Sequence, residues 1–186
     1  MIKRYLIRLS GHVSAGSSVQ VLPGFLAMKR KPTILVVASS GGHLTQAMCA
    51  TSTVELELVL VTNKNMLDDS RFSRIHTIRD TQNNLLIHAL NTFAAARILL
   101  KEKPQALFST GGPICLPFAL LARLSGTRFV YLDTMSRVTE LSNSGKLIQK
   151  LGLSDSFLCQ WQDIASKYNG AEYHGQAFDL GDNGHK

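Results

Sequence analysis

Two glycine-rich segments are the places in this sequence where the chain could hold a phosphate group. Ser39-Ser40-Gly41-Gly42-His43 and Ser109-Thr110-Gly111-Gly112-Pro113 each follow an apolar run and each lead into a helical pattern. Glycine lets the backbone approach a ligand closely, and the free N–H groups at a helix start favour an anion. Glycines at such turns also serve simply to let a helix pack against a strand, so both interpretations remain open. The candidate phosphate ligands are Ser40, Gly41, Gly42, Thr110, Gly111 and Gly112.

Two side chains near these turns are candidate catalytic groups. His43 directly follows two glycines at a helix start, where an imidazole could contact a phosphate or act as a general base. A lone histidine is more often structural. Asp133 opens a polar segment after a further apolar run, with Arg137 four residues on. A carboxylate and a guanidinium suit a polar ligand, although loops of this kind are usually just solvated. No Ser-His-Asp or Cys-His set and no metal-ligand cluster stands out.

A dinucleotide site is a poor match for this sequence. Such a site uses G-x-G-x-x-G after the first strand and an acidic residue at the end of the second strand. Here the glycines are adjacent, and the second apolar run ends in Thr62-Asn63-Lys64-Asn65. A nicotinamide or flavin oxidoreductase is therefore not expected, and no cofactor is predicted.

Apolar runs alternate with helical patterns along most of the chain, which predicts an α/β fold. We expect a Rossmann-like parallel sheet with helices on both faces and ligands at the carboxyl ends of its strands. The stretch from Asn63 to Arg74 is polar and is assigned no strand. Strands are expected at residues 33–38, 56–62, 106–108, 129–132 and 156–159 and near Glu172; helices are expected from about Leu44, along Leu85–Leu100, up to Ser125 and from about Gly145.

The composition limits the classes of protein that the chain can belong to. Hydrophobic residues make up 45% and charged residues 18% of 186 residues, which is typical of a globular domain. No window approaches the roughly 18 uninterrupted apolar residues of a spanning helix. The net charge is +7, but six basic residues precede the first acidic residue, Glu55, and the rest of the chain is nearly balanced. This distribution argues against a nucleic-acid partner. Three widely spaced cysteines are expected to be reduced core residues in the cytosol: Cys49, Cys115 and Cys159.

The sequence divides into residues 1–31, a folded domain at 32–180 and a polar tail at 181–186. In the first segment, apolar residues fall on one helical stripe with basic residues beside it, which is typical of a helix lying in an anionic membrane interface. The same segment could be a targeting peptide, or Met28 could be the true start. The stripe consists of Ile2, Tyr5, Leu6, Leu9 and Val13, flanked by Lys3, Arg4 and Arg8.

Several segments resemble a known glycosyltransferase family. Gly41-Gly42-His43 is similar to the glycine-rich loop of MurG-like GT-B enzymes. More specific is the stretch from Tyr131 to Lys146, YLDTMSRVTELSNSGK, followed by Gln160-Trp161 and Tyr173-His174-Gly175. These segments resemble the PssD-type subunits of bacterial exopolysaccharide assembly and the eukaryotic Alg-type subunit of dolichol-linked N-acetylglucosamine transfer. The resemblance runs from about Thr33 to Phe178.

The resemblance implies a division of labour between two proteins. This chain would be the acceptor-side half of a split GT-B enzyme, held peripherally on the inner, cytoplasmic face of the membrane. A small partner subunit would bind the UDP-sugar, and the acceptor would be a polyprenyl-pyrophosphate-linked glycan. Gly41, Gly42 and His43 would face the acceptor pyrophosphate, beside the second glycine turn. The residues implied for the active cleft or partner surface are Ser136, Arg137, Glu140, Ser142, Gly145 and Lys146.

Two departures from the family pattern and three hypotheses follow. The eukaryotic subunits carry an N-terminal anchor where this chain has only a basic stripe, and Asp133 stands where the eukaryotic form has a glutamate.

The leading hypothesis is an inverting glycosyltransferase subunit that is inactive without its partner. The second is a non-catalytic membrane adaptor that recruits and activates the transferase. The third, a separate nucleotide-binding module, is disfavoured because the ribose-binding acid is missing.

Overall fold

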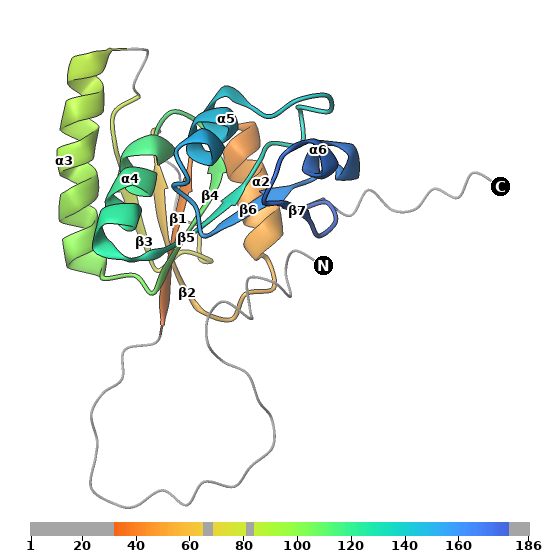
Figure 1. Ribbon diagram of the computed structural model, residues 1–186. Coiled ribbons are helices and arrows are strands. Elements are labelled where there is room, and N and C mark those ends of the chain that lie inside the picture. Colours follow the sequence, from red (N-terminus) through yellow and green to blue (C-terminus); the bar gives the residue numbers. More distant parts are fainter. Residues whose placement is uncertain (1–31, 65–68, 81–83, 179–186) are drawn as a thin grey trace, which may run out of the picture.

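The computed structural model describes residues 32–64, 69–80 and 84–178 (Figure 1). The expected basic stripe of residues 1–31 and the polar tail of residues 181–186 lie outside these described residues. Among the helices that the model describes, none is long and apolar enough to cross a membrane.

Seven parallel strands form one sheet in the order β3-β2-β1-β4-β5-β6-β7. β1 and β4 are buried along their whole length and β2 is buried after its first residue, as strands covered on both faces should be. The Rossmann-like parallel sheet expected from the sequence is therefore confirmed. The strands are β1 (Thr33–Ala38), β2 (Glu57–Thr62), β3 (Arg74–Thr77), β4 (Ala106–Gly111), β5 (Arg128–Leu132), β6 (Ser156–Cys159) and β7 (Ala171–Tyr173).

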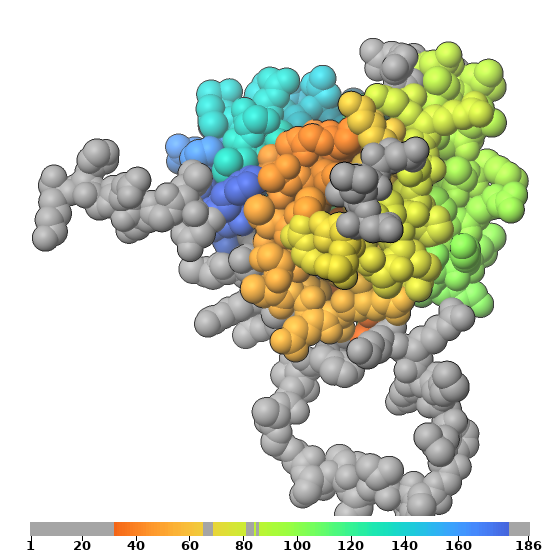
Figure 2. Space-filling view, turned by 180° about the vertical axis from the view of Figure 1, so that it is seen from behind, coloured from red at the N-terminus to blue at the C-terminus, as the bar shows by residue number. Residues whose placement is uncertain are grey.

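Helices cover both faces of this sheet, as expected. One face packs against α3, α4, α5 and α6, with alternate strand residues such as Leu35 and Phe129 beneath them. The other face packs against α2 and against the residues that follow β7, which lie side by side in Figure 2. The helices are α2 (Gly42–Thr51), α3 (Leu85–Glu102), α4 (Cys115–Ser125), α5 (Asn143–Lys150) and α6 (Gln162–Lys167).

Two elements were not expected from the sequence. β3 lies at the edge of the sheet and is half-exposed, so its residues are polar and show no apolar run. The six-residue helix α6 is too short for its periodicity to stand out. In addition, α2 and α5 begin two residues earlier than expected, at Gly42 and Asn143.

The strand β4 runs through residues that were expected to form a turn. It continues to Gly111, because the buried Ser109 hydroxyl donates a hydrogen bond of 2.6 Å to the carbonyl oxygen of Val37. A polar side chain whose hydrogen bond is satisfied by a neighbouring strand can stay inside a sheet. The second glycine turn is therefore shorter than the sequence suggested, and it begins at the end of Gly111.

The strand order reverses between β1 and β4, at the centre of the sheet. At such a switch point the connections leave in opposite directions and open a crevice outside the carboxyl ends of the strands. Gly41 follows β1, and Gly112 follows β4. The topology thus brings the two glycine segments together at the position where open α/β sheets bind ligands.

Candidate functional site

The first glycine turn leaves backbone donors available at the start of α2. Gly41 adopts a φ of 90° and precedes the helix without any side-chain cap, and the first turn carries no acidic residue. The Ser40 N–H is occupied, because it donates to Asn63 Oδ1 over 2.7 Å. The N–H groups of Gly42 and His43 have no acceptor among the described residues. This helix start can therefore accept an anionic ligand.

The second glycine turn packs directly against the first. Gly111 and Gly112 have φ angles of 107° and 86°, which side chains rarely adopt. A Cβ on Gly111 would lie 2.9 Å from Tyr131 Oη and 3.2 Å from His43 Cε1. A Cβ on Gly112 would overlap the Ser39 hydroxyl. Close packing and backbone conformation therefore both require glycine at these two positions. A role in packing does not exclude a role in binding a ligand.

His43, at the start of α2, and Thr110, near the end of β4, tie the two glycine segments together. His43 Nδ1 lies 2.8 Å from the carbonyl oxygen of Thr110, and the Thr110 hydroxyl donates to the carbonyl oxygen of His43 over 2.6 Å. A carbonyl oxygen can only accept, so the proton of a neutral imidazole sits on Nδ1. Nε2 then carries the lone pair. The half-buried His43 ring is therefore held in place with one nitrogen able to accept a proton.

The Ser39 hydroxyl is a polar group that the fold itself leaves unsatisfied. It is buried, lies beside Gly112, and has no hydrogen-bond partner within the described part of the chain. Buried hydroxyls almost always have a partner, and an exception points to a bound water, ion or ligand. Ser39 belongs to the first glycine segment, but the sequence offered no reason to single it out from Ser40. Burial, which only the fold reveals, is the signal.

Asp133 lies just below the surface of the same edge, with 2% of its surface exposed. Its carboxylate accepts hydrogen bonds from the Ser142 N–H at 3.0 Å and from the Ser142 hydroxyl at 2.5 Å. Tyr131 Oη donates to it over 3.2 Å. Burial, followed by the nearby Cys115 and Asp133, raises the pKa of Tyr131 well above its ordinary value, so the phenol keeps its proton. This arrangement suits a carboxylate that holds the surrounding chain in place.

Ser142 and Gly145 build the start of α5 onto Asp133. Ser142 caps the helix by accepting a hydrogen bond from the Gly145 N–H over 3.0 Å. A Cβ on Gly145 would lie only 2.7 Å from Asp133 Oδ1. Capping by Ser142 and close packing of Gly145 around the buried Asp133 carboxylate thus explain the spacing of these three residues.

The signature loop, residues 134–146, also carries four predicted residues that face outward. Ser136, Arg137, Glu140 and Lys146 are all exposed. Glu140 lies 2.6 Å from Lys146 and 3.6 Å from Arg137, and the Lys146 ammonium, followed by Arg137, lowers the pKa of Glu140. Exposed ion pairs contribute little to stability. These residues are therefore available for contacts with another molecule.

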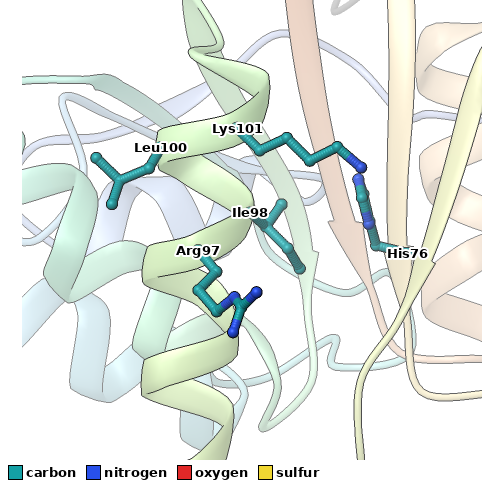
Figure 3. A pocket seen from close by; sticks show the side chains of 5 residues that line it. All are labelled: His76, Arg97, Ile98, Leu100 and Lys101. Atoms are coloured by element: carbon teal, nitrogen blue, oxygen red, sulfur yellow. The ribbon is translucent and has the colours of Figure 1, made fainter.

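An open pocket lies away from the predicted site residues. It has a volume of about 550 Å³ and is lined by His76 of β3 and by residues of α3, and Figure 3 shows the Lys101 side chain extending toward His76. β3 is the edge strand, two strands away from β1. None of the predicted site residues lines this pocket. The residues from α3 are Arg97, Ile98, Leu100 and Lys101.

The cysteines offer no nucleophile at the site. Cys115 and Cys159 are buried as expected, and burial raises the pKa of each thiol to about 12. Cys49 is only partly buried, so the expectation of a core position is wrong for this residue. Among the described residues, no group of three or more His, Cys, Asp or Glu side chains is arranged to hold a metal ion.

Comparisons with known proteins identify the family of the chain. A family model described as "Oligosaccharide biosynthesis protein Alg14 like" matches residues 56–177. The chain is 28% identical over 185 residues to the UDP-N-acetylglucosamine transferase subunit ALG14 of Yarrowia lipolytica, covering 82% of this chain and 85% of that protein. It is 25% identical over 190 residues to the mouse protein of the same name, covering 83% and 87%.

Solved structures show the same fold. MurG from Acinetobacter baumannii aligns with a TM-score of 0.65 and 14% identity, covering 79% of this chain. The UDP-N-acetylglucosamine 2-epimerase of Rickettsia bellii aligns with a TM-score of 0.61 and 14% identity, again over 79% of this chain. This chain spans 46% of the MurG chain and 45% of the epimerase chain, about half of each. The expected resemblance to an Alg-type subunit is confirmed: the chain belongs to the family of Alg14-like oligosaccharide biosynthesis proteins.

Proposed function

We propose that this chain is the acceptor-binding subunit of a two-component glycosyltransferase. The complex transfers a sugar of the N-acetylglucosamine or glucuronic acid type from a UDP-sugar to a polyprenyl-pyrophosphate-linked glycan. The product is a lipid-linked oligosaccharide or a polysaccharide precursor. The single observation that carries the proposal is the pair of glycine turns at the switch point, where the Gly42 and His43 N–H groups and the Ser39 hydroxyl lack partners among the described residues.

These groups match the chemistry of a pyrophosphate. Its oxygens accept hydrogen bonds from the helix start, and the helix dipole favours their negative charge. Gly41 and Gly42 have open space where a Cβ would stand, so a ligand can approach the backbone. The Gly111–Gly112 turn forms the opposite wall. The acceptor pyrophosphate is therefore placed over the α2 start, with its first sugar directed toward His43.

His43 is the proposed proton acceptor. The acceptor hydroxyl oxygen attacks the anomeric carbon of the donor sugar, the bond from that carbon to UDP breaks, and UDP leaves with the electron pair. The hydroxyl proton passes to His43 Nε2, which is free because Nδ1 is bonded to the Thr110 carbonyl. A single displacement of this kind inverts the anomeric centre. Asp133 holds the loop that completes the cleft.

The donor half is proposed to come from a separate small subunit. Support comes from the curated relatives, which are named transferase subunits, and from the share of MurG that this chain spans. The partner docks on the exposed side of the signature loop and brings the UDP-sugar to the carboxyl edge of the sheet. The complex works peripherally on the cytoplasmic face of a membrane, where polyprenyl-linked acceptors are held, and residues 1–31 contribute basic charge for that contact.

A non-catalytic membrane adaptor is the second candidate. It is favoured by the number of contacts that Asp133 already makes, because a carboxylate bonded to Ser142 and Tyr131 is not free to accept a proton from a substrate. In that case the chain would recruit and activate a transferase that supplies its own base.

Reconstitution tests the proposal directly. The purified chain is titrated with candidate UDP-sugars by calorimetry and assayed for transfer to a polyprenyl-pyrophosphate-linked glycan, alone and with its partner subunit. We expect the chain alone to bind nucleotide sugars weakly and to transfer no sugar. With the partner added, we expect both nucleotide-sugar binding and sugar transfer. Robust turnover by the isolated chain would refute the two-component proposal.

A further inference from the structure

Two buried glutamine side chains meet beneath the signature loop. Gln46 lies on α2, one turn after His43, and Gln160 follows β6; their exposed fractions are 5% and 1%. Gln160 Nε2 donates a hydrogen bond of 2.9 Å to Gln46 Oε1. The Gln160-Trp161 motif stood out in the sequence, but its contact with Gln46 could not be predicted, because the two residues are 114 positions apart.

Each glutamine also holds backbone from another segment. Gln46 Nε2 donates to the Thr134 hydroxyl over 3.2 Å, and Gln46 Oε1 accepts from the Met135 N–H over 3.3 Å. Gln160 Nε2 donates to the Asp133 carbonyl oxygen over 2.8 Å. Thus α2, which begins at the glycine turn, is bonded directly to the first residues of the signature loop.

Gln160 extends the network to the end of the described domain. Its Oε1 accepts a hydrogen bond of 3.0 Å from the Ala177 N–H. The neighbouring Trp161 donates from Nε1 to the Met135 carbonyl oxygen over 2.9 Å. Met135 is therefore held at both its N–H and its carbonyl group by side chains from other elements. A buried network in which each of these polar atoms is satisfied favours one conformation of the segments that it joins.

We propose that Gln46 and Gln160 are positioning residues of the transferase site. They hold the signature loop, which faces the partner, at a defined place relative to the glycine turn, which faces the acceptor. This inference rests on the proposed function for its catalytic consequence. Its structural part, the anchoring of the loop by two carboxamides, can be measured without partner or substrate.

The groups around Gln46 can donate hydrogen bonds, whereas most of those around Gln160 can only accept them. This difference makes a matched pair of variants possible. The three groups that face Gln46 can all donate a hydrogen bond: the Thr134 hydroxyl, the Met135 N–H and Gln160 Nε2. Two of the three groups that face Gln160 can only accept, namely the Asp133 carbonyl and Gln46 Oε1. Gln46→Glu and Gln160→Glu both replace a carboxamide by a carboxyl group of nearly the same shape. Only in Gln160→Glu does the new carboxylate face groups that, like itself, can only accept hydrogen bonds.

Trp161 is the only tryptophan of the chain, so its fluorescence reports directly on the loop. In the full chain we expect Gln160→Glu to shift the Trp161 emission to longer wavelength and to increase quenching by a soluble quencher, with unchanged far-ultraviolet circular dichroism. Gln46→Glu should retain an emission close to that of the wild type. Thr51→Val is the control for a lost buried polar group, because its hydroxyl bonds only within α2, to the Ala47 carbonyl. Equal emission in Gln160→Glu and wild type would overturn the proposal.

Hydrogen exchange in the wild-type chain provides a test that does not depend on any variant folding. The amides of Met135 and Ala177, which donate to the two glutamines, should exchange at least about tenfold more slowly than that of Val138, which has no acceptor among the described residues. Exchange as fast as that of Val138 would overturn the proposal.

The catalytic consequence is measured with the partner present. Gln160→Glu should lower kcat about tenfold or more, since leaving buried groups unsatisfied displaces the loop. The KM for the acceptor should change less than about twofold, because the N–H groups of the α2 start are untouched. Thr51→Val should leave both constants unchanged. An unchanged kcat for Gln160→Glu, in a sample whose Trp161 emission has shifted, would show that loop position does not matter for transfer. A wild-type complex without activity would instead contradict the proposed function and leave the fluorescence result standing.

Discussion

His43 and Thr110 hold each other by two hydrogen bonds, one from the imidazole Nδ1 to the Thr110 carbonyl and one from the Thr110 hydroxyl to the His43 carbonyl. The two residues are 67 positions apart; His43 lies at the start of α2, and Thr110 lies near the end of β4. This contact holds the two glycine segments side by side at the carboxyl ends of β1 and β4. It also directs the free Nε2 lone pair of His43 away from the protein backbone that holds Nδ1.

The two nitrogens of His43 can be tested separately. His43→Asn keeps a side-chain N–H near the Thr110 carbonyl but removes Nε2, whereas His43→Ala removes both. We expect both variants to fold and to bind the partner, and to lower transfer by the assembled complex about a hundredfold, because general-base assistance is lost. A transfer assay with saturating partner measures this effect. Activity of His43→Asn within twofold of wild type would assign His43 to structure and favour the adaptor.

Substitution of Gly42 should have opposite effects on the stability of the fold and on pyrophosphate binding. Gly42 begins α2 with an ordinary φ and open space around it, so Gly42→Ala should raise the free energy of unfolding by about 0.5–1 kcal/mol. The added methyl group should nevertheless weaken pyrophosphate binding, since it stands where the ligand approaches. Gly145→Ala is the contrasting variant. Its Cβ would meet the Asp133 carboxylate, so stability should fall. Denaturant unfolding and calorimetry with pyrophosphate measure the two effects. Improved stability with unchanged pyrophosphate binding would contradict the placement of the ligand.

Removal of the unsatisfied Ser39 hydroxyl should likewise weaken pyrophosphate binding without destabilising the fold. Ser39→Ala removes a buried group that has no partner in the described structure, so the free energy of unfolding should be unchanged or higher by about 1 kcal/mol. Binding of pyrophosphate should weaken if this hydroxyl serves the ligand. Thr51→Val is the control, because the Thr51 hydroxyl is satisfied within its own helix and its loss should destabilise the protein. A Ser39→Ala protein that is clearly less stable than wild type would show that the hydroxyl has a structural partner.

Residues 1–27 should be dispensable for folding but not for membrane contact. The first strand begins at Thr33, so removal of residues 1–27 leaves the described sheet complete. Binding to vesicles that contain anionic lipid should decrease on truncation and become less sensitive to salt, because screening weakens surface attraction. A sedimentation assay with anionic and neutral vesicles, at low and high salt, measures both changes. Equal binding by the full-length and truncated chains would exclude a membrane role for this segment.

The acid stability of the fold should depend on Glu102 at the end of α3. Desolvation of this buried carboxylate opposes its ionisation, but hydrogen bonds from His76 and Arg74 outweigh that effect and lower its pKa from 4.5. Because the folded pKa is depressed, the stabilisation is present above the unfolded value and is lost as the pH falls through the folded pKa. The wild-type free energy of unfolding should therefore fall more steeply below about pH 4.5 than that of Glu102→Gln. Glu55→Gln controls for the loss of one negative charge at an exposed glutamate. Parallel pH profiles for wild type and Glu102→Gln would contradict this prediction.

The sequence by itself determined the central sheet and predicted where a site would lie. Continuous apolar runs such as Thr33–Ala38 can only be buried on both faces, which requires a parallel sheet covered by helices. Polar and glycine-rich segments that follow such strands must then gather at one edge. His43, Gly42 and Gly112 were predicted on this basis. The edge strand Arg74–Thr77 was missed because one exposed strand at the border of a sheet needs no apolar run.

Only the tertiary structure decided which of these residues face each other and which are already engaged. The spacing of Asp133, Ser142 and Gly145 suggested a site. The fold shows instead that Ser142 caps α5 and that the buried Asp133 carboxylate holds Ser142 and packs against Gly145. The unsatisfied Ser39 and the Gln46–Gln160 pair have no signature in the sequence, because a hydrogen bond between residues far apart in the chain depends on how the segments meet. Local patterns specify which elements form. Long-range contacts determine which polar groups remain free to act on a substrate.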